Sequence, residues 1–352
     1  MTDRPTIGVI ANPLSGKDVR RIAARGAVAT NEDKRNRIAR AVVGAVSSGV
    51  ERVVVMGEPF GIASGAVRDL RLDLEVNVLD VGKALRPETT ATAAVEMRRL
   101  GVDVVIVLGG DGTNRIISMA WPDVTLAPMS TGTNNVFPTP IEPTIIGAAA
   151  GLVATGRVDR ETHAPRSKIV HVTDGDGASE TALIDAVVLV DDFVGNRMPY
   201  EPASLRQLVV SRSEPTAIGV SAIAGRVEPC TERDDAGVLV ECGPGGRPVT
   251  VPLGPGLFRT VEVRSARHLE LGESVPLDAQ GADGRPGIVA FDGDRLVTTG
   301  PDVTAAVRRD GPRVVDVPGV MQTAAVNGAF DGAAHGLDDD LRRGPTPSAE
   351  PT

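Results

Sequence analysis

The segment 109–113, Gly-Gly-Asp-Gly-Thr, directly follows the mostly apolar run 102–108. Glycines let a loop backbone approach a ligand closely, and exposed N–H groups in such a loop can bind phosphate oxygens. A carboxylate would repel phosphate, so Asp111 needs another task, either binding Mg²⁺ or accepting the proton of an attacking hydroxyl. The alternative is a structural aspartate that caps a helix or closes an Asx turn.

Two further polar loops follow apolar runs in the first half of the chain. Residues 12–17 follow the run 6–11, and residues 130–135 follow the run 124–129. All three loops offer backbone N–H groups, small hydroxyls or both, which suits the phosphates of a nucleotide. We therefore predict a phosphate site with Asp111 as the catalytic residue and the following binding residues: Asn12, Ser15, Gly16, Lys17, Gly109, Gly110, Gly112, Thr113, Asn114, Thr131, Gly132, Thr133 and Asn134.

Two common phosphate-binding motifs are excluded by the spacing. A P-loop requires a glycine five positions before the Gly-Lys pair and a Ser or Thr after it, but this chain has Ala11 and Asp18 there. A dinucleotide fingerprint that begins at Gly110 would end on Arg115 instead of Gly or Ala. Neither a Walker-type ATPase nor an ordinary dehydrogenase is indicated.

Hydrophobic patterns divide the chain into two regions that differ in predicted secondary structure. Strands are expected at 6–11, 53–56, 74–81 and 102–108, with helices at 31–47 and 89–100 between them. This alternation predicts an α/β domain with a parallel sheet covered on both faces, in three layers. Ligands of such sheets bind beyond the carboxyl ends of the strands, where the glycine loops would lie.

The second half predicts an all-β, sandwich-like domain. Short apolar runs separated by Gly and Pro indicate strands at 167–172, 182–190, 217–223, 237–242, 260–263, 287–291 and 294–298. A last helix is expected at 317–330, followed by a polar tail that we expect to be disordered. The predicted units are an α/β phosphate-binding domain at 1–160, a β-sandwich substrate domain at 161–312, a helix packing back at 313–331 and a disordered tail at 332–352.

Composition limits the partners. The 352-residue chain has a formal net charge of −9 and only 2% aromatic residues, which argues against a nucleic-acid binder. No basic cluster predicts membrane-surface binding, and the longest apolar stretch, 145–154, is about half a membrane span. Cys230 and Cys242 fit no metal spacing and are expected to be free thiols. Because no secretion signal is evident, we expect a cytoplasmic protein.

Two weaker acidic candidates flank the apolar run 186–190. Asp185 and Asp192 could bind Mg²⁺ or contact an acceptor. The alternative is that they only solvate the ends of a strand.

The three loops together resemble the NAD kinase/diacylglycerol kinase superfamily, in particular its ATP-NAD kinase-like branch named for acetoin catabolism protein X. The resemblance rests on Asn-Pro-x-Ser-Gly-Lys at 12–17, Gly-Gly-Asp-Gly-Thr at 109–113 and Gly-Thr-Asn-Asn-Val-Phe at 132–137. It implies an N-terminal α/β domain and a C-terminal β-sandwich with the active site between them. It also implies ATP and Mg²⁺ as cofactors, Asp111 as general base or metal organiser, nucleotide phosphates on the other two loops, and a homo-oligomer.

The sequence departs from the superfamily where the acceptor would bind. The Asn-Glu pair by which NAD kinases bind NAD lies downstream of the Gly-Gly-Asp-Gly-Thr element, but the only such pair here is Asn31-Glu32, far upstream. The Gly-Ser-Thr-Ala-Tyr element of NAD kinases is absent. Lipid kinases carry an Asp-Gly-Glu element, and its nearest match is 292–294, Asp-Gly-Asp, which adds Asp292 to the weak metal or acceptor candidates.

The sequence therefore predicts an ATP- and Mg²⁺-dependent kinase that phosphorylates the hydroxyl of a small molecule. The resemblance names NAD as the acceptor, and a small hydroxy-metabolite of an acetoin-like catabolic pathway is the alternative. A hypothesis from another class is a non-catalytic regulatory protein that binds NAD(P) or ATP. The sequence leaves the choice between ATP and polyphosphate as donor open.

Overall fold

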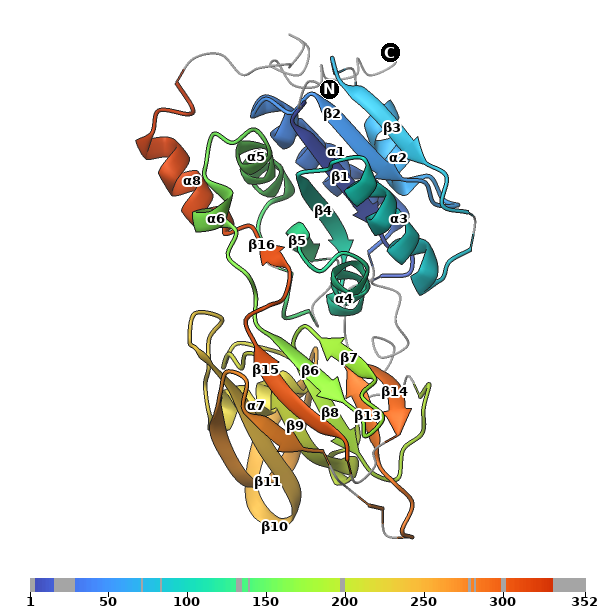
Figure 1. Cartoon of the computed structure of the whole chain (residues 1–352), viewed down its shortest axis with the longest axis vertical. Coiled ribbons are helices and arrows are strands. Elements are labelled where there is room, and N and C mark those ends of the chain that lie inside the picture. The colour runs from blue at the N-terminus through green and yellow to red at the C-terminus, as the bar shows by residue number, and fades with distance from the viewer. Residues whose placement is uncertain are drawn as a thin grey trace, which may run out of the picture.

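The computed structural model describes residues 4–15, 29–70, 72–82, 84–130, 135–138, 140–196, 200–277, 280–281, 283–298 and 302–331. Figure 1 shows a helix-covered sheet above a domain built mainly of strands. The disorder expected for 332–352 concerns residues outside the described ones. No helix in the described part of the chain combines the length and the apolar character that crossing a membrane requires.

The upper domain contains a six-stranded sheet in the order β16-β5-β4-β1-β2-β3, in which every pair is parallel. Its central strands β1 and β4 are buried along their whole length, which explains their continuous apolar sequences. Strand order reverses between β1 and β4, and this is the switch point beyond which such sheets bind ligands. The strands are β1 (Thr6–Ala11), β2 (Arg52–Met56), β3 (Glu75–Leu79), β4 (Val104–Gly109), β5 (Thr125–Ser130) and β16 (Arg313–Val314).

Helices cover both faces of this sheet, as predicted. One core joins the sheet to α1, α2, α5 and α8, and a second core on the other face joins it to α3 and α4. The helices are α1 (Asn31–Ser47), α2 (Ile62–Arg68), α3 (Pro87–Arg99), α4 (Asp111–Ala120), α5 (Pro143–Ala154), α6 (Arg160–His163) and α8 (Val317–Val326).

Helices α1 and α5 approach each other closely because glycines line their contact. A Cβ atom built on Gly147 would lie 1.8 Å from the Ala41 carbonyl oxygen, and one on Gly44 would lie 2.1 Å from that of Thr144. No side chain fits at these positions without moving a backbone. The pair packs on β1 and β4 in one shared core.

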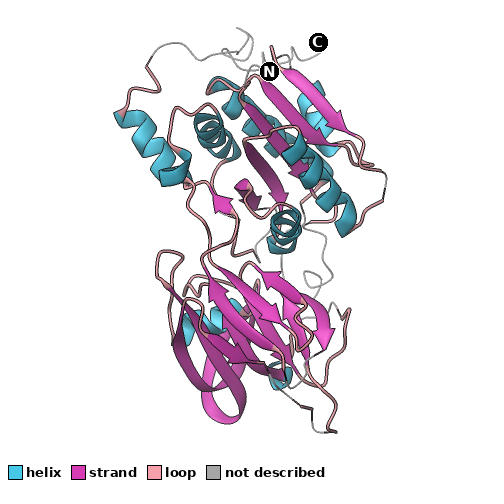
Figure 2. Cartoon of the chain, viewed as in Figure 1, coloured by secondary structure: helices cyan, strands magenta, loops and turns pink. Residues whose placement is uncertain are grey.

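The lower domain consists mainly of strands, as Figure 2 shows, and its strand pairs are antiparallel. A six-stranded sheet, β11-β10-β9-β8-β13-β14, packs against a four-stranded sheet, β12-β15-β6-β7, through a shared apolar core. The predicted sandwich is therefore confirmed. Its elements are β6 (Ile169–Thr173), β7 (Ser179–Ala182), β8 (Asp185–Leu189), η2 (Pro202–Ser204), β9 (Leu205–Val210), α7 (Ser221–Val227), β10 (Ala236–Gly254), β11 (Leu257–Glu270), β12 (Ser274–Pro276), β13 (Ile288–Phe291), β14 (Asp294–Thr298) and β15 (Thr304–Arg308).

The strand expected at 217–223 is wrong, because this region leads into helix α7. A short apolar run does not distinguish a strand from a buried helical turn. Ile223 and Ala224 of α7 pack on the six-stranded sheet, on the side away from the four-stranded one. Gly225 permits a close approach of α7 to the segment that precedes it, since a Cβ there would lie 2.4 Å from the Glu214 carbonyl oxygen.

The chain crosses between the domains twice, and the two crossings run side by side. The Ser167 N–H donates to the Pro312 carbonyl at 2.9 Å, and the Gly311 N–H donates to the Ser167 carbonyl at 3.0 Å. After the second crossing, β16 joins the upper sheet beside β5 and α8 packs on α5. The upper domain is thus built from both ends of the chain.

Candidate active site

The loop after β1 touches the beginning of α4, at the switch point of the sheet. The Asn12 side-chain amide donates to the Thr113 hydroxyl at 2.9 Å, and its backbone N–H donates to the Leu108 carbonyl at 3.0 Å. The Asn12 side-chain oxygen accepts from the Leu14 N–H at 2.9 Å, and the Ser15 hydroxyl donates to the Asn12 carbonyl at 2.7 Å. The first two glycine-bearing loops therefore meet, as the sequence predicted.

A buried lysine of α1 supports the first loop from behind. The Lys34 ammonium donates to the Pro13 carbonyl at 2.7 Å and to the Asn12 carbonyl at 3.1 Å, and the residue is fully buried. The charged hydrogen bonds of the ammonium group hold the backbone of the loop in one conformation. The positive charge of Lys34 also makes the electrostatic potential at this end of β1 more favourable for an anion.

Asp111 connects the second loop to the third. It is the first residue of α4, and its two carboxylate oxygens accept one hydrogen bond each, from the Val136 N–H at 3.1 Å and the Phe137 N–H at 3.0 Å. Gly110 makes the approach possible, because a Cβ there would lie 2.8 Å from the side-chain oxygen of Asn135. The segments after β1, β4 and β5 thus meet at the start of α4.

Some of the predicted phosphate-binding residues cannot be placed. Gly16 and Lys17 of the first loop, and Thr131, Gly132, Thr133 and Asn134 of the third, lie outside the described residues. Gly109, Gly112 and Asn114 belong to the described part. Asn114 is buried and its side-chain amide donates to the Gly110 carbonyl at 3.0 Å, which stabilises the turn that starts α4.

The surroundings of Asp111 change its acidity. Burial, reinforced by the neighbouring carboxylate of Asp292, raises the pKa of Asp111 to about 6. The two N–H donors and the charge of Arg212 act in the opposite direction. A carboxylate whose pKa lies near the pH of the cell can accept and release a proton, which is what a general base requires.

Asp292 lies opposite Asp111, in the turn between β13 and β14, where it adopts a left-handed backbone with φ +47°. Its carboxylate accepts from the N–H groups of Leu183 at 2.8 Å, Ile184 at 2.8 Å and Asp185 at 3.3 Å. Burial raises the pKa of Asp292, while the charge of Arg115 opposes the rise. Its lone pairs are largely used by the protein, so the carboxylate acts as an anchor within the sandwich.

Arg115 of α4 crosses the domain junction to reach this anchor. Its guanidinium lies 3.5 Å from an Asp294 oxygen, 3.7 Å from a Glu180 oxygen and 3.9 Å from an Asp292 oxygen, and only 6% of the side chain is exposed. One buried cation from the upper domain therefore faces three carboxylates from the lower one. This contact ties the helix that carries Asp111 to the sandwich.

The two remaining acidic candidates lie at opposite ends of β8. Asp185 is buried beside Asp292, with its backbone carbonyl accepting from the Asp292 N–H at 3.0 Å. The Asp192 carboxylate accepts from Arg295 at 2.7 Å, in an ion pair whose side chains are 9% and 1% exposed. Asp185 therefore belongs to the surroundings of the site, whereas Asp192 is engaged in a buried ion pair after the far end of the strand.

The donor set around Asp111 fits Mg²⁺ that arrives with a nucleotide rather than a resident metal. Among the described residues, no three His, Cys, Asp or Glu side chains are grouped so as to hold a metal ion. Mg²⁺ in kinases is bound by phosphate oxygens, waters and only one or two carboxylates. Each Asp111 oxygen accepts a single hydrogen bond in the structure, so one lone pair of each stays available, either for a metal or for a proton.

Three residues of this site were missed by the sequence analysis: Lys34, Arg115 and Arg212. Lys34 lies in an amphipathic helix, where a lysine is normally expected to face solvent. Arg115 had a detectable signal, since it follows Asp111 by four residues and so lies on the same side of a helix. No local pattern indicates Arg212, because Val136, to which it donates, lies 76 residues away in the sequence.

A parallel sheet with its loops gathered at the switch point, joined to an antiparallel sandwich, is the two-domain arrangement that the sequence motifs implied. Residues 168–310 match the family described as the acetoin catabolism protein X C-terminal domain. The chain is 37% identical over 336 residues to acetoin catabolism protein X of Cupriavidus necator, an alignment that covers 91% of this chain and 92% of that protein. The chain therefore belongs to the acetoin catabolism protein X family.

Solved structures of similar arrangement include two kinases. Yeast NADH kinase in complex with NADH aligns with a TM-score of 0.45 at 12% identity, over 96% of this chain and 91% of that one. A diacylglycerol kinase from Bacillus anthracis aligns with a TM-score of 0.46 at 13% identity, over 91% of this chain and 100% of that one.

Proposed function

We propose that this protein is a kinase that transfers the γ-phosphoryl group of ATP to a hydroxyl group of a small molecule. The observation that carries the proposal is the position of Asp111. It begins α4 at the switch point, joins the loops that follow β4 and β5, and has a pKa of about 6. Such a group is suited to accept the proton of an alcohol during transfer.

In the proposed reaction, an oxygen of the acceptor forms a bond to the γ-phosphorus and its proton passes to an Asp111 oxygen. The bond between the γ-phosphorus and the β–γ bridging oxygen breaks, and ADP leaves. Asn12, Ser15 and Thr113, together with glycines 109, 110 and 112, orient the phosphates, and Gly16, Lys17, Thr131, Gly132, Thr133 and Asn134 complete the cradle. Mg²⁺ would be held by the phosphate oxygens, which leaves Asp111 to take the proton, and it would supply charge neutralisation at the transferring group.

The acceptor is NAD or a small hydroxy-metabolite. NAD is suggested by the superfamily motifs at 12–17 and 109–113. The hydroxy-metabolite is suggested by the name of the Cupriavidus necator relative, which refers to acetoin catabolism. The two acceptors differ in size and charge, so a direct assay distinguishes them.

The test is a phosphoryl-transfer assay with ATP and Mg²⁺ on NAD⁺, acetoin-like hydroxy-ketones and small polyols, repeated with polyphosphate as donor. Formation of NADP⁺ would identify an NAD kinase, and phosphorylation of a hydroxy-ketone or polyol would identify a metabolite kinase. If ATP binds but no acceptor is phosphorylated, the kinase proposal fails.

That last outcome would favour the second candidate, a regulatory protein that binds NAD(P) or ATP without turnover. One observation supports it: both Asp111 oxygens already accept backbone N–H groups, as those of a purely structural aspartate would. The two candidates make opposite predictions for turnover and the same prediction for binding.

A further inference from the structure

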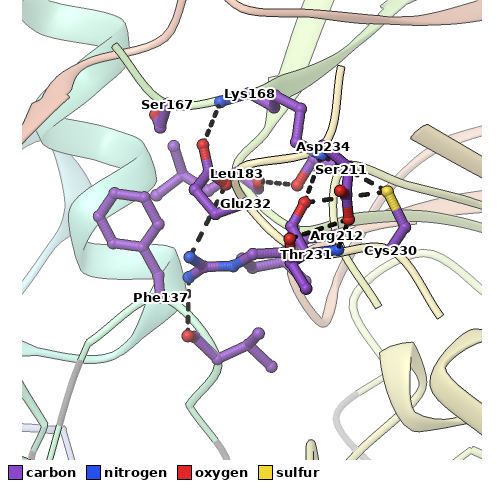
Figure 3. A network of polar contacts seen from close by, with 12 residues as sticks. Phe137, Ser167, Lys168, Leu183, Ser211, Arg212, Cys230, Thr231, Glu232 and Asp234 are labelled. Atoms are coloured by element: carbon purple, nitrogen blue, oxygen red, sulfur yellow. Dashed lines mark hydrogen bonds and ion pairs between the residues drawn. The ribbon is translucent and has the colours of Figure 1, made fainter. Parts of the chain in front are cut away.

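Arg212 reaches from the sandwich to the loop that Asp111 holds. It follows β9, and the residues on either side of it are fully buried and fixed. The Ser211 hydroxyl donates to the Leu183 carbonyl at 2.6 Å, and the Ser213 N–H donates to the Cys230 carbonyl at 2.7 Å. The backbone of Arg212 is therefore anchored, and its side chain points from a rigid support (Figure 3).

The guanidinium contacts the same two residues that bind Asp111. Arg212 donates to the Val136 carbonyl at 2.7 Å, and its guanidinium carbon lies 5.5 Å from the centre of the Phe137 ring. The N–H groups of Val136 and Phe137 donate to the Asp111 carboxylate. One short segment is thus held from the upper domain by Asp111 and from the lower domain by Arg212.

A second set of contacts fixes Arg212 to the two chain crossings. A Glu232 oxygen lies 3.8 Å from its guanidinium, and the other Glu232 oxygen accepts from the Lys168 N–H at 2.9 Å and from Arg309 at 3.4 Å. Lys168 and Arg309 belong to the segments that connect the domains. Figure 3 shows the part of this chain of contacts that runs from Arg212 through Glu232 to Lys168.

We propose that Arg212 is the positioning residue of this site, which couples the placement of the sandwich to the orientation of the Asp111 carboxylate through the 136–137 segment. The effect of Arg212 on kcat rests on the proposed kinase function. Its effects on the 136–137 segment and on the charge of Asp111 do not depend on that function.

The electrostatic consequence concerns the protonation of Asp111. The charged groups that face it are Asp292 from the β13–β14 turn and Arg212 from the end of β9, with Arg115 of its own helix and Asp294 nearby. Arg212 lowers the pKa of Asp111 and Asp292 raises it. Loss of the Arg212 charge therefore raises the pKa further and reduces the fraction of ionised Asp111 at neutral pH.

The variants that test this are Arg212→Met, which removes the charge and the hydrogen bond, and Arg212→Lys, which keeps the charge. Arg206→Met is the matched control, because Arg206 lies on β9, the strand that Arg212 follows, and bonds only to carbonyls of its own segment in the contacts observed. Circular dichroism and thermal unfolding establish that each variant folds.

The first measurement is amide hydrogen exchange of the full chain, followed by NMR, at the Val136 and Phe137 N–H groups that donate to Asp111. We expect both amides to exchange at least about tenfold faster in Arg212→Met and to change little in Arg206→Met, while the amides of β1 stay protected. Unchanged exchange of both amides in Arg212→Met would overturn the proposal, whether or not the protein is a kinase.

The second measurement is kcat and KM for the acceptor that the transfer assay identifies. In Arg212→Met a misplaced Asp111 carboxylate should lower kcat about tenfold and change the KM for ATP less than about twofold, and Arg212→Lys should regain part of the loss. A kcat that is unchanged in Arg212→Met, or that falls equally in Arg206→Met, would contradict the proposal. Absence of transfer in the wild type would contradict the kinase function alone.

Discussion

Arg115 of α4 and Asp292 of the β13–β14 turn face each other across the domain junction, with 3.9 Å between the guanidinium Nε and a carboxylate oxygen. The arginine side chain is 6% exposed and that of the aspartate is fully buried. Removal of one charge of a buried ion pair strongly lowers the stability of the fold, because the other charge stays buried without compensation. Here the two charges belong to different domains.

We therefore expect Arg115→Met to lower the free energy of unfolding by about 1–3 kcal/mol at pH 8. The loss should be smaller at pH 5, since the pKa of Asp292 is already raised and rises further when the cation is removed, so protonation relieves the buried charge. Chemical denaturation at the two pH values measures both effects. Arg98→Met, which removes a pair whose side chains are each 57% exposed, is the control and should change stability little.

Thr113→Val tests the link between the first two loops. The substitution preserves shape but removes the hydroxyl that accepts from the Asn12 amide. Loss of one such hydrogen bond costs about 1 kcal/mol, so we expect ATP to bind roughly fivefold more weakly. Isothermal titration calorimetry with Mg²⁺-ATP measures the change. Thr92→Val on the exposed side of α3 should leave the affinity unaltered, and equal affinities for both variants would mean that this link does not shape the nucleotide site.

The pKa of Asp111 also predicts how stability depends on pH. A carboxyl group whose pKa rises from 3.8 to about 6 on folding binds its proton more tightly in the folded state. Its contribution is therefore fully present below pH 3.8 and is lost as the pH rises through about 6, to a total of about 3 kcal/mol. Asp111→Asn should abolish this part of the slope between pH 4 and 6. A slope identical to that of the wild type would show that Asp111 titrates normally.

Gly147→Ala tests the close packing of α5 against α1. The carbon of the new methyl group would lie only 1.8 Å from the Ala41 carbonyl oxygen, which is a severe overlap. Helices α1 and α5 must then move apart, and we expect a loss of stability of about 1–3 kcal/mol or more. Thermal unfolding measures it. An unchanged midpoint would mean that the two helices do not pack as closely as the structure shows.

The sequence predicted the alternating half of the upper domain well, because each of its buried strands and amphipathic helices carries its own periodicity. Helices α1 and α3 and strands β1 to β4 lie within a few residues of where the pattern indicated. Helix α5 was not recognised, since it is apolar on nearly all sides and packs between α1, α8 and the sheet. Strands β9 and β15 were also missed, and the segment before α7 was read as a strand.

The site was predictable only in part, for a physical reason. The carboxyl ends of parallel strands meet at one edge, so loops that follow β1, β4 and β5 could be expected to come together. Contacts across the domain junction depend instead on how two domains pack. Arg115 meets Asp292 over 177 residues of sequence, and no periodicity encodes such a pairing.

The most direct test of the central claim compares Asp111→Asn with Asp123→Asn, a matched change at an exposed aspartate whose side chain is 57% accessible. Both variants should bind Mg²⁺-ATP, measured by calorimetry. In transfer of the γ-phosphoryl group from radiolabelled ATP to the best acceptor of the panel, we predict that Asp111→Asn loses activity by at least about a hundredfold. Asp123→Asn should retain it. Transfer by Asp111→Asn at a rate close to that of the wild type would contradict the assignment of Asp111 as the base.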